Sequence, residues 1–291
     1  MARLEMLRRK VDDVDQQMAA LLEKRLKLVL EIMEEKKHRR LPVFSKDREA
    51  EVIERVGNHV RNPLLKEEVR FIHQYVVQSC RRIQSRRLFP YHITLVGFMG
   101  SGKTTVGVEL SKLLAMEQID VDQVIEERSK MRISDIFEHF GEKTFRKMES
   151  DVVEELSKRH NVIIFCSGGG VVLNESNVEN IKRTGVVIWL KASPEEIYRR
   201  IKDDETRPLL KDDMSVEKIN EMLMNRLHLY EEASDLVIET DHKTVEEVSF
   251  EIVERLMEAD FDRKVDEMEA DPADLVPRVM KAMDEASESY K

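Results

Sequence analysis

Apolar residues recur at helical spacing along the first part of the chain, and no glycine or proline interrupts this pattern between residue 3 and Pro42. The spacing predicts one long helix over residues 3 to about 39. Its apolar stripe consists of Leu4, Leu7, Val11, Val14, Met18, Leu21, Leu22, Leu28 and Ile32. Residues 46–56 and 64–85 predict two further helices, separated by turn residues. Because so long a helix cannot pack on itself, it needs a partner helix.

From residue 92 the pattern changes to short apolar runs, each followed by apolar residues at helical spacing. The runs that fit buried parallel strands are 92–96, 162–165, 186–190 and 236–238. This alternation predicts a doubly wound α/β domain with a parallel sheet. The chain is acidic after residue 260, and Leu275, Val279 and Met283 predict one short amphipathic helix there.

Length and composition agree with two domains. The chain has 291 residues, of which 36% are charged and 5% aromatic, as in a helix-rich soluble protein. We therefore expect an all-helical domain at 1–89, an α/β domain at 91–260 and an acidic tail at 261–291. The apolar stretches are shorter than the roughly 20 residues of a membrane span. The N-terminus lacks the apolar core of a signal peptide, so a cytoplasmic protein without membrane contact is expected.

Charge is distributed unevenly along the chain. Residues 1–90 carry 21 Lys and Arg against 14 Asp and Glu, a balance of +7, so the remaining 201 residues carry −17. The cations of the helical part are interleaved with acids, and few aromatic residues are present to stack on bases. We therefore expect a small anionic ligand there and no nucleic acid. The two cysteines, Cys80 and Cys166, make neither a disulfide framework nor a metal-ligand spacing.

The strongest chemical signal is the phosphate-binding pattern G-x-x-x-x-G-K-[ST] at residues 97–104. It follows a predicted strand and precedes apolar residues at helical spacing over 106–114. Glycines let the backbone wrap around an anion, and the helix N-terminus directs unpaired N–H groups at it. Lys103 would reach the β- and γ-phosphates, and the Thr104 hydroxyl would bind Mg²⁺. The expected ATP-binding residues of this loop are Gly100, Ser101, Gly102, Lys103, Thr104 and Thr105.

Four further motifs narrow the reaction. Two carboxylates in Asp120-Val121-Asp122, if on a strand, share one face, so one can approach Mg²⁺ while the other meets a substrate hydroxyl. Gly168–Gly170 follows a predicted strand at its carboxyl end, where α/β domains bind ligands. Arg146 and Glu149 are helical neighbours, a spacing more typical of a surface ion pair than of a site. Arg207 lies in a polar stretch typical of a mobile lid.

Together and in this order, the segments GFMGSGKT, DVD, FRKME, SGGG, RPLL and NRLHLYEE resemble the shikimate kinase family over residues 92–258. The resemblance implies that Asp122 binds shikimate hydroxyls and orients or deprotonates the attacking one. It also implies that Arg146 and Arg226 hold the shikimate carboxylate, and that the Gly168–Gly170 backbone contacts the ring hydroxyls.

The same resemblance implies the nucleotide contacts. Arg207 would close over the phosphates, Arg200 would lie against adenine, and Asp120 would hold Mg²⁺ through water. Arg200 is alternatively a solvated helix residue. His228 departs from the family, which commonly has proline there, but Arg226 keeps its place. Another small-molecule kinase with a phosphate loop, acting on gluconate or a nucleotide, is an alternative reading.

Cationic residues of the first helix suggest a second site. Arg25 and Lys36 are eleven residues apart, three helical turns, and so project from one face. Arg8 lies about 25 Å before Arg25 at 1.5 Å per residue. If Arg8 joins the same pocket, it must come from a second, antiparallel chain. Polar residues of the later helices that could complete this pocket are Arg48, Glu49 and Gln84.

These residues, in LRRKVDDVD, LLEKRLKLV, KDRE and SCRRIQ, resemble the all-helical chorismate mutase family over residues 1–88. The resemblance implies an interlaced homodimer that rearranges chorismate to prephenate without a cofactor, by positioning and charge stabilisation. It implies that Arg25 and the partner's Arg8 hold the two carboxylates, with Arg48 supporting that side. Lys36 and Gln84 would donate to the ether oxygen, and Glu49 would accept from the ring hydroxyl.

Two positions depart from the mutase family: Ser45 replaces a common acidic residue, and Cys80 replaces a common serine. The sequence therefore predicts a bifunctional enzyme of aromatic biosynthesis, a shikimate kinase fused to a chorismate mutase. The alternative is a kinase with a phosphate loop whose helical module serves only dimerisation or regulation.

Overall fold

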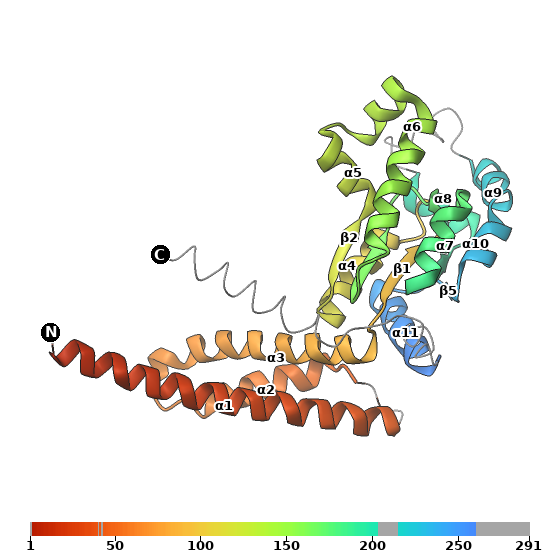
Figure 1. Cartoon of the computed structure of the whole chain (residues 1–291). Coiled ribbons are helices and arrows are strands. Elements are labelled where there is room, and N and C mark those ends of the chain that lie inside the picture. The colour runs from red at the N-terminus through yellow and green to blue at the C-terminus, as the bar shows by residue number, and fades with distance from the viewer. Residues whose placement is uncertain (1, 40, 42, 203–214, 260–291) are drawn as a thin grey trace. The chain divides into compact units, whose positions relative to one another are not determined.

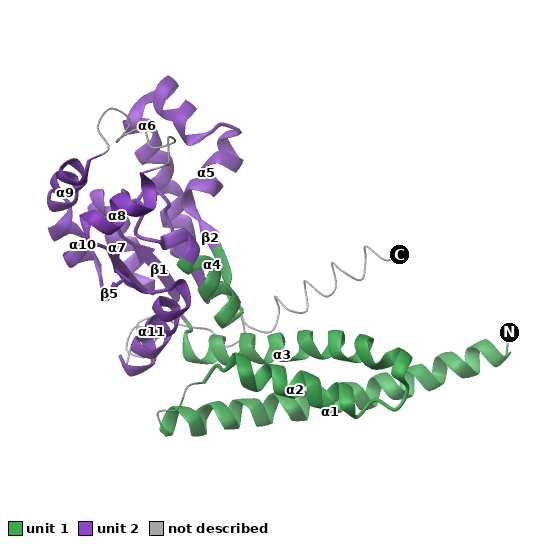
Figure 2. Ribbon diagram, turned by 180° about the vertical axis from the view of Figure 1, so that it is seen from behind, with its two compact units in different colours: residues 1–90, 106–118 green, residues 91–105, 119–291 purple. Residues whose placement is uncertain are grey.

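A computed structural model describes residues 2–39, 41, 43–202 and 215–259 of the chain (Figure 1). The chain divides into two compact units, shown in different colours in Figure 2. Unit 1 comprises residues 1–90 and 106–118, and unit 2 comprises residues 91–105 and 119–291. Arg207 and the expected helix of the tail lie outside the described residues. Over the described ranges, none of the helices combines the length and the apolar character that a membrane crossing requires.

Unit 1 contains the three expected helices, α1 (Ala2–His38), α2 (Lys46–Asn58) and α3 (Lys66–Leu88), with a short 3₁₀ helix η1 (Pro63–Leu65) before α3 (Figure 1). Ser45 caps α2 by accepting a hydrogen bond from the Arg48 backbone N–H. Asn62 caps η1 in the same way, because short polar side chains satisfy the free N–H groups at a helix start. The predicted helical fold is confirmed.

The apolar stripe of α1 stays largely exposed within one copy of the chain. Met33 is the buried residue of this helix, whereas Leu21 is 66% exposed and Val11 58%. A helix of 37 residues is about 55 Å long, and the shorter α2 and α3 cannot cover all of it. An exposed apolar face of this extent indicates an interaction surface.

Unit 2 is built on a five-stranded sheet with strand order β2-β3-β1-β4-β5. The strands are β1 (His92–Val96), β2 (Glu117–Asp120), β3 (Val162–Phe165), β4 (Gly185–Lys191) and β5 (Leu236–Glu239). β1 pairs in parallel with β3 and with β4, and β4 pairs in parallel with β5. The predicted parallel sheet is confirmed, and every residue of β1 is buried, as expected of a strand covered on both faces.

Helices alternate with these strands. They are α4 (Lys103–Leu114), α5 (Val121–Ser129), α6 (Ile133–Leu156), α7 (Glu175–Thr184), α8 (Pro194–Ile201), α9 (Val216–Met224), α10 (Leu227–Ala233) and α11 (Val245–Glu258), with a 3₁₀ helix η2 (Val171–Leu173). One buried cluster joins Val96, Val187 and Trp189 of the sheet to side chains of α5 through α10. This core holds the carboxyl ends of the strands, where the candidate site lies.

Candidate active sites

The phosphate loop connects β1 to α4. Gly97, Gly100 and Gly102 have positive φ angles, and a Cβ on Gly97 would lie 2.5 Å from the Leu190 carbonyl oxygen. Only glycine tolerates both conditions. Lys103 is 3% exposed, and its Nζ donates to the carbonyl oxygens of Gly97 at 3.0 Å and Phe98 at 2.9 Å. The loop therefore folds around the ammonium group at the start of α4.

Three oxygen-bearing side chains meet beside this loop. The Thr104 hydroxyl lies 3.1 Å from the Ser167 hydroxyl, which donates to Asp120 Oδ2 at 2.6 Å. They come from α4, from the segment after β3 and from the end of β2. Hydroxyl and carboxylate oxygens are the ligands that Mg²⁺ prefers, usually together with phosphate and water. This set therefore fits a magnesium ion, and Ser167, in the SGGG motif, is a member that sequence reasoning missed.

Asp120 and Asp122 do not share a strand, so that part of the sequence interpretation is wrong. β2 ends at Asp120, whose carboxylate caps α5 by accepting from the Asp122 N–H at 3.1 Å. Asp122 lies in the first turn of α5 because this capping bond starts the helix immediately. The two carboxylates nevertheless lie close enough for the charge of Asp120 to raise the pKa of Asp122.

Asp122 has an unusual environment. Its Oδ2 accepts from the Gly168 N–H at 2.9 Å, while its buried Oδ1 has no hydrogen-bond partner among the described residues. Burial, and secondly the charge of Asp120, raise the pKa of Asp122 to about 6, against opposing effects of Gly168 and Lys103. A carboxylate with a pKa near neutrality and a free oxygen is suited to accept a proton.

Arg146 and Glu149 form an ion pair, but not a surface pair. Arg146 Nη1 lies 2.9 Å and 3.1 Å from the two carboxylate oxygens of Glu149, and Glu149 is 2% exposed. Burial raises the pKa of Glu149, and the charge of Arg146 opposes this shift. A Cβ on Gly170 would lie 2.4 Å from Arg146 Nη1, so the guanidinium packs directly on the glycine loop.

The glycine loop also packs on the phosphate loop. Gly169 has a φ of +72°, and a Cβ there would lie 2.4 Å from the Gly97 carbonyl oxygen. On the other side, the Tyr230 hydroxyl donates to the Gly169 carbonyl at 2.8 Å. Arg226, four residues earlier, lies with its guanidinium carbon 5.7 Å from the centre of the Phe98 ring. The structure thus gathers most of the predicted shikimate residues around the phosphate loop.

Arg200 is held by several partners, so the alternative of a solvated helix residue is wrong. Its guanidinium donates to Glu196 Oε1 at 2.8 Å, to the Thr240 carbonyl at 2.9 Å and to the Gly100 carbonyl at 3.3 Å. Hydrogen bonds from Arg199, followed by the charge of Arg200, lower the pKa of Glu196 to about 2. Arg200 therefore ties α8 to the phosphate loop and to the segment after β5.

The predicted mutase residues are only partly gathered within one copy. Arg25 Nη1 donates to Cys80 Sγ at 2.6 Å, and Lys36 Nζ donates to the Val43 carbonyl at 3.1 Å. Gln84 is buried on α3. Burial raises the pKa of Glu49, and the charges of Arg81 and Lys36 oppose the shift. Arg25, Lys36, Glu49 and Gln84 thus lie in partly or fully buried positions.

Two other predicted mutase residues lie in exposed ion pairs within their own helices. Arg8 Nη1 is 3.3 Å from Glu5, and Arg48 Nη1 is 2.8 Å from Glu51. Both arginine side chains are more than half exposed. The exposed Arg8–Glu5 pair agrees with the expectation from helix geometry that Arg8 does not reach Arg25 of its own chain.

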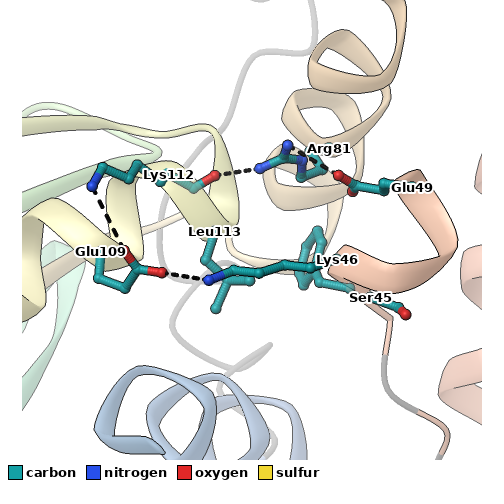
Figure 3. Close-up of a pocket in the computed structure, with 8 residues that line it drawn as sticks. Ser45, Lys46, Glu49, Arg81, Glu109, Lys112 and Leu113 are labelled. Carbon is teal, nitrogen blue, oxygen red and sulfur yellow. Dashed lines mark hydrogen bonds and ion pairs between the residues drawn. The ribbon is translucent and has the colours of Figure 1, made fainter. Parts of the chain in front are cut away.

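A pocket of about 370 Å³ in unit 1 contains Glu49 (Figure 3). It is lined by Phe44, Ser45, Lys46, Glu49, Arg81, Glu109, Lys112 and Leu113. Arg81 Nη2 pairs with Glu49 Oε2 at 3.0 Å, and Lys46 Nζ pairs with Glu109 at 2.9 Å. Arg81 is thus a partner of Glu49 that sequence reasoning missed, although it stands in the same SCRRIQ segment as Gln84.

Comparison with protein families gives two matches that do not overlap. The model described as shikimate kinase matches residues 99–257, and the model described as chorismate mutase type II matches residues 7–85. The shikimate kinase of Thermodesulfovibrio yellowstonii is 42% identical over 162 residues, covering 56% of this chain and 92% of that protein. That of Caldicellulosiruptor bescii is 44% identical over 162 residues, covering 56% and 93%.

Solved structures give the same result. Shikimate kinase from Acinetobacter baumannii in complex with shikimate aligns with a TM-score of 0.58 at 34% identity, covering 61% of this chain and 99% of that one. The enzyme from Bacteroides thetaiotaomicron aligns with a TM-score of 0.52 at 31% identity, covering 58% and 98%. The chain therefore belongs to the shikimate kinase family and carries an N-terminal chorismate mutase type II region.

Proposed function

We propose that this chain is a bifunctional, cytoplasmic enzyme of aromatic biosynthesis. Its α/β domain, at 91–260, phosphorylates shikimate to shikimate 3-phosphate with MgATP, and its helical domain, at 1–89, converts chorismate to prephenate. The observation that supports the kinase assignment is that three features lie together. They are the phosphate loop, the half-buried carboxylate of Asp122 with its unpartnered Oδ1, and the glycine loop that packs on Arg146. The two reactions belong to one pathway but are not consecutive.

In the kinase reaction, Asp122 binds the attacking hydroxyl through Oδ1 and accepts its proton. The N–H of Gly168 keeps the other oxygen of this carboxylate in place. Lys103 leaves the Gly97 and Phe98 carbonyls to bind the β- and γ-phosphates. Thr104 and Asp120, the latter through water, would hold Mg²⁺, which would supply positive charge against the phosphates. Catalysis is therefore mainly positioning and electrostatic stabilisation.

The remaining kinase contacts divide into two groups. Arg146 and Arg226 bind the shikimate carboxylate, and the backbone of Gly168, Gly169 and Gly170 binds the ring hydroxyls. The phosphate chain lies on the backbone N–H groups of Gly100, Ser101, Gly102 and Thr105, with Arg207 closing over it. Arg200 lies against adenine, and its bonds to Gly100 and Thr240 hold it beside the phosphate loop.

In the mutase reaction, Arg25 and the partner's Arg8 bind the two carboxylates of chorismate, with Arg48 supporting them. Lys36 and Gln84 donate to the ether oxygen, and Glu49 accepts from the ring hydroxyl. A pericyclic rearrangement needs no nucleophile, and the site needs no cofactor. The exposed apolar stripe of α1 and the exposed position of Arg8 support a homodimer in which α1 pairs with a second copy.

The second candidate is a shikimate kinase whose helical module is not catalytic. The observations that favour it are the outward position of Arg48 and the residues Ser45 and Cys80 at two mutase positions. One paired experiment separates the candidates: the purified chain is assayed with shikimate plus MgATP, and with chorismate alone. Prephenate formation refutes the non-catalytic module. Faster phosphorylation of gluconate or AMP than of shikimate refutes the kinase assignment.

A further inference from the structure

Tyr230 occupies a central position among the predicted shikimate contacts without belonging to them. It lies on α10, is fully buried, and its ring stacks on Trp189 with centroids 5.7 Å apart and planes 15° apart. Trp189 belongs to β4. The ring therefore anchors α10 to the sheet, and the hydroxyl alone reaches the site.

The hydroxyl of Tyr230 has a hydrogen-bond partner and a charged neighbour. It donates to the Gly169 carbonyl at 2.8 Å. The Arg226 guanidinium lies near enough to oppose the rise in the pKa of Tyr230 that burial causes. The hydroxyl thus lies between the glycine loop and an arginine of the predicted shikimate site.

Tyr230 holds the carbonyl side of a closely packed glycine. Gly169 has positive φ and lies against the Gly97 carbonyl and the Met99 backbone nitrogen of the phosphate loop. Its N–H donates to the Cys166 carbonyl at 3.2 Å. Among the described residues, the side chain that bonds to the Gly169 carbonyl is Tyr230. Removing the hydroxyl leaves this buried carbonyl without its donor and the glycine loop without its tie to α10.

We propose that Tyr230 is a positioning residue for shikimate: its hydroxyl sets the glycine loop and Arg226 at the spacing that binds the ring hydroxyls and the carboxylate of one substrate molecule. This proposal rests on the proposed kinase function. Tyr230 thus differs from an ordinary core residue in having two roles. Its ring stabilises the fold by packing on Trp189, and its hydroxyl positions the groups that bind shikimate.

Tyr230→Phe in the full chain tests this division because it keeps the stacked ring and removes only the hydroxyl. The loss of one bond that aligns two contact groups predicts a KM for shikimate about tenfold higher. The KM for MgATP is expected to stay within about twofold, because Lys103 and the loop that binds it are untouched. Tyr198→Phe on α8 is the matched control and leaves both constants unchanged.

A double-variant cycle provides a second, independent measurement. Arg226→Lys keeps the charge but loses the planar guanidinium beside the Tyr230 hydroxyl. If the two residues act together on one substrate molecule, the double variant raises the KM for shikimate no more than about twofold beyond the worse single variant. Multiplicative effects of the two substitutions would show that they act independently and would refute the proposal.

The outcomes separate the positioning role from the proposed function. A wild-type chain that does not phosphorylate shikimate refutes both. An active wild type whose Tyr230→Phe variant has an unchanged KM for shikimate refutes the positioning role alone, even if the variant melts at a lower temperature. An equal rise of the KM for shikimate and for MgATP also refutes it, because that result indicates general loosening of the domain.

Discussion

Replacing Asp122 with asparagine should abolish phosphorylation and at the same time stabilise the protein. The carboxylate is half-buried, with Asp120 nearby and one oxygen unpartnered. These features make it a good proton acceptor and a poor contributor to folding. Asparagine keeps the shape and an oxygen that can accept from the Gly168 N–H, but it carries no charge. Phosphorylation should fall by at least about a hundredfold, as expected for loss of a general base, while MgATP binding is retained.

The size of the stabilisation follows from the pKa of Asp122, which lies at about 6 rather than 3.8. About two pKa units, at roughly 1.4 kcal/mol each, correspond to at most about 3 kcal/mol of destabilisation when the carboxylate is ionised. The pKa of about 6 already includes the opposing hydrogen bond from Gly168, and allowing for the partial exposure of the carboxylate leaves about 2 kcal/mol of this gain. A net gain of about 2 kcal/mol corresponds to roughly 4–8 °C in Tm for a domain of this size.

The pH dependence gives the sign of the effect. Because the folded-state pKa is higher than the unfolded-state value, protonated Asp122 contributes stability below about pH 4 that is lost as the pH rises through about 6. The difference in Tm between variant and wild type should therefore be largest at pH 7.5 and should fall to about a third of that value at pH 4.5. Thermal unfolding is followed without nucleotide or metal ion at both pH values.

The exposed Asp151 of α6 provides the control, since Asp151→Asn should move the Tm by less than about 1 °C. An unchanged or lower Tm of Asp122→Asn at pH 7.5 would refute the assigned environment of this carboxylate. Near-normal turnover of the same variant would refute its role as the base. A Tm difference of the expected size that is the same at both pH values would show that the variant is stabilised by packing and not by removal of the charge.

Three further predictions concern the other proposed residues. Lys103→Ala should abolish phosphorylation but leave prephenate formation within about threefold, because the mutase site uses no residue of the phosphate loop. Parallel assays of the two reactions check this, and an equal loss of both activities would contradict it. Arg207→Ala should lower kcat more than it raises the KM for ATP, since its charge acts most strongly on the transferring phosphoryl group; a pure KM effect would make Arg207 a ground-state contact. Mixing inactive Arg8→Ala and Lys36→Ala chains should restore about a quarter of wild-type mutase activity, because about half of the dimers are mixed and each has one intact pocket. No recovery after verified subunit exchange would place Arg8 outside the shared site.

Local spacing was sufficient to predict the three helices of the N-terminal part of the chain and most of the strands of the α/β part. The phosphate loop between a strand and a helix, the long N-terminal helix and four of the five strands follow from periodicity and glycine positions, which are properties of neighbouring residues. Periodicity did not locate β2, and the strand suggested for Asp120–Asp122 extends too far, because only Ile119 of the four residues of β2 is buried and this edge strand shows no clear alternation. Likewise, nothing in the spacing of Asp120 and Asp122 reveals that a capping bond begins a helix between them.

Only the tertiary structure decided which chemical groups meet. Ser167 joins Thr104 and Asp120 across sequence separations of 63 and 47 residues, and Tyr230 reaches Gly169 across 61. The ion pair of Arg146 and Glu149, expected at the surface, instead has a buried carboxylate and lies against the glycine loop. These results depend on strand order and on the exclusion of water, neither of which is encoded in any short segment. The sequence by itself therefore determined the phosphate loop and the helical pattern, whereas the packing of the parallel sheet determined the surroundings of Asp122, its pKa and its bond from Gly168.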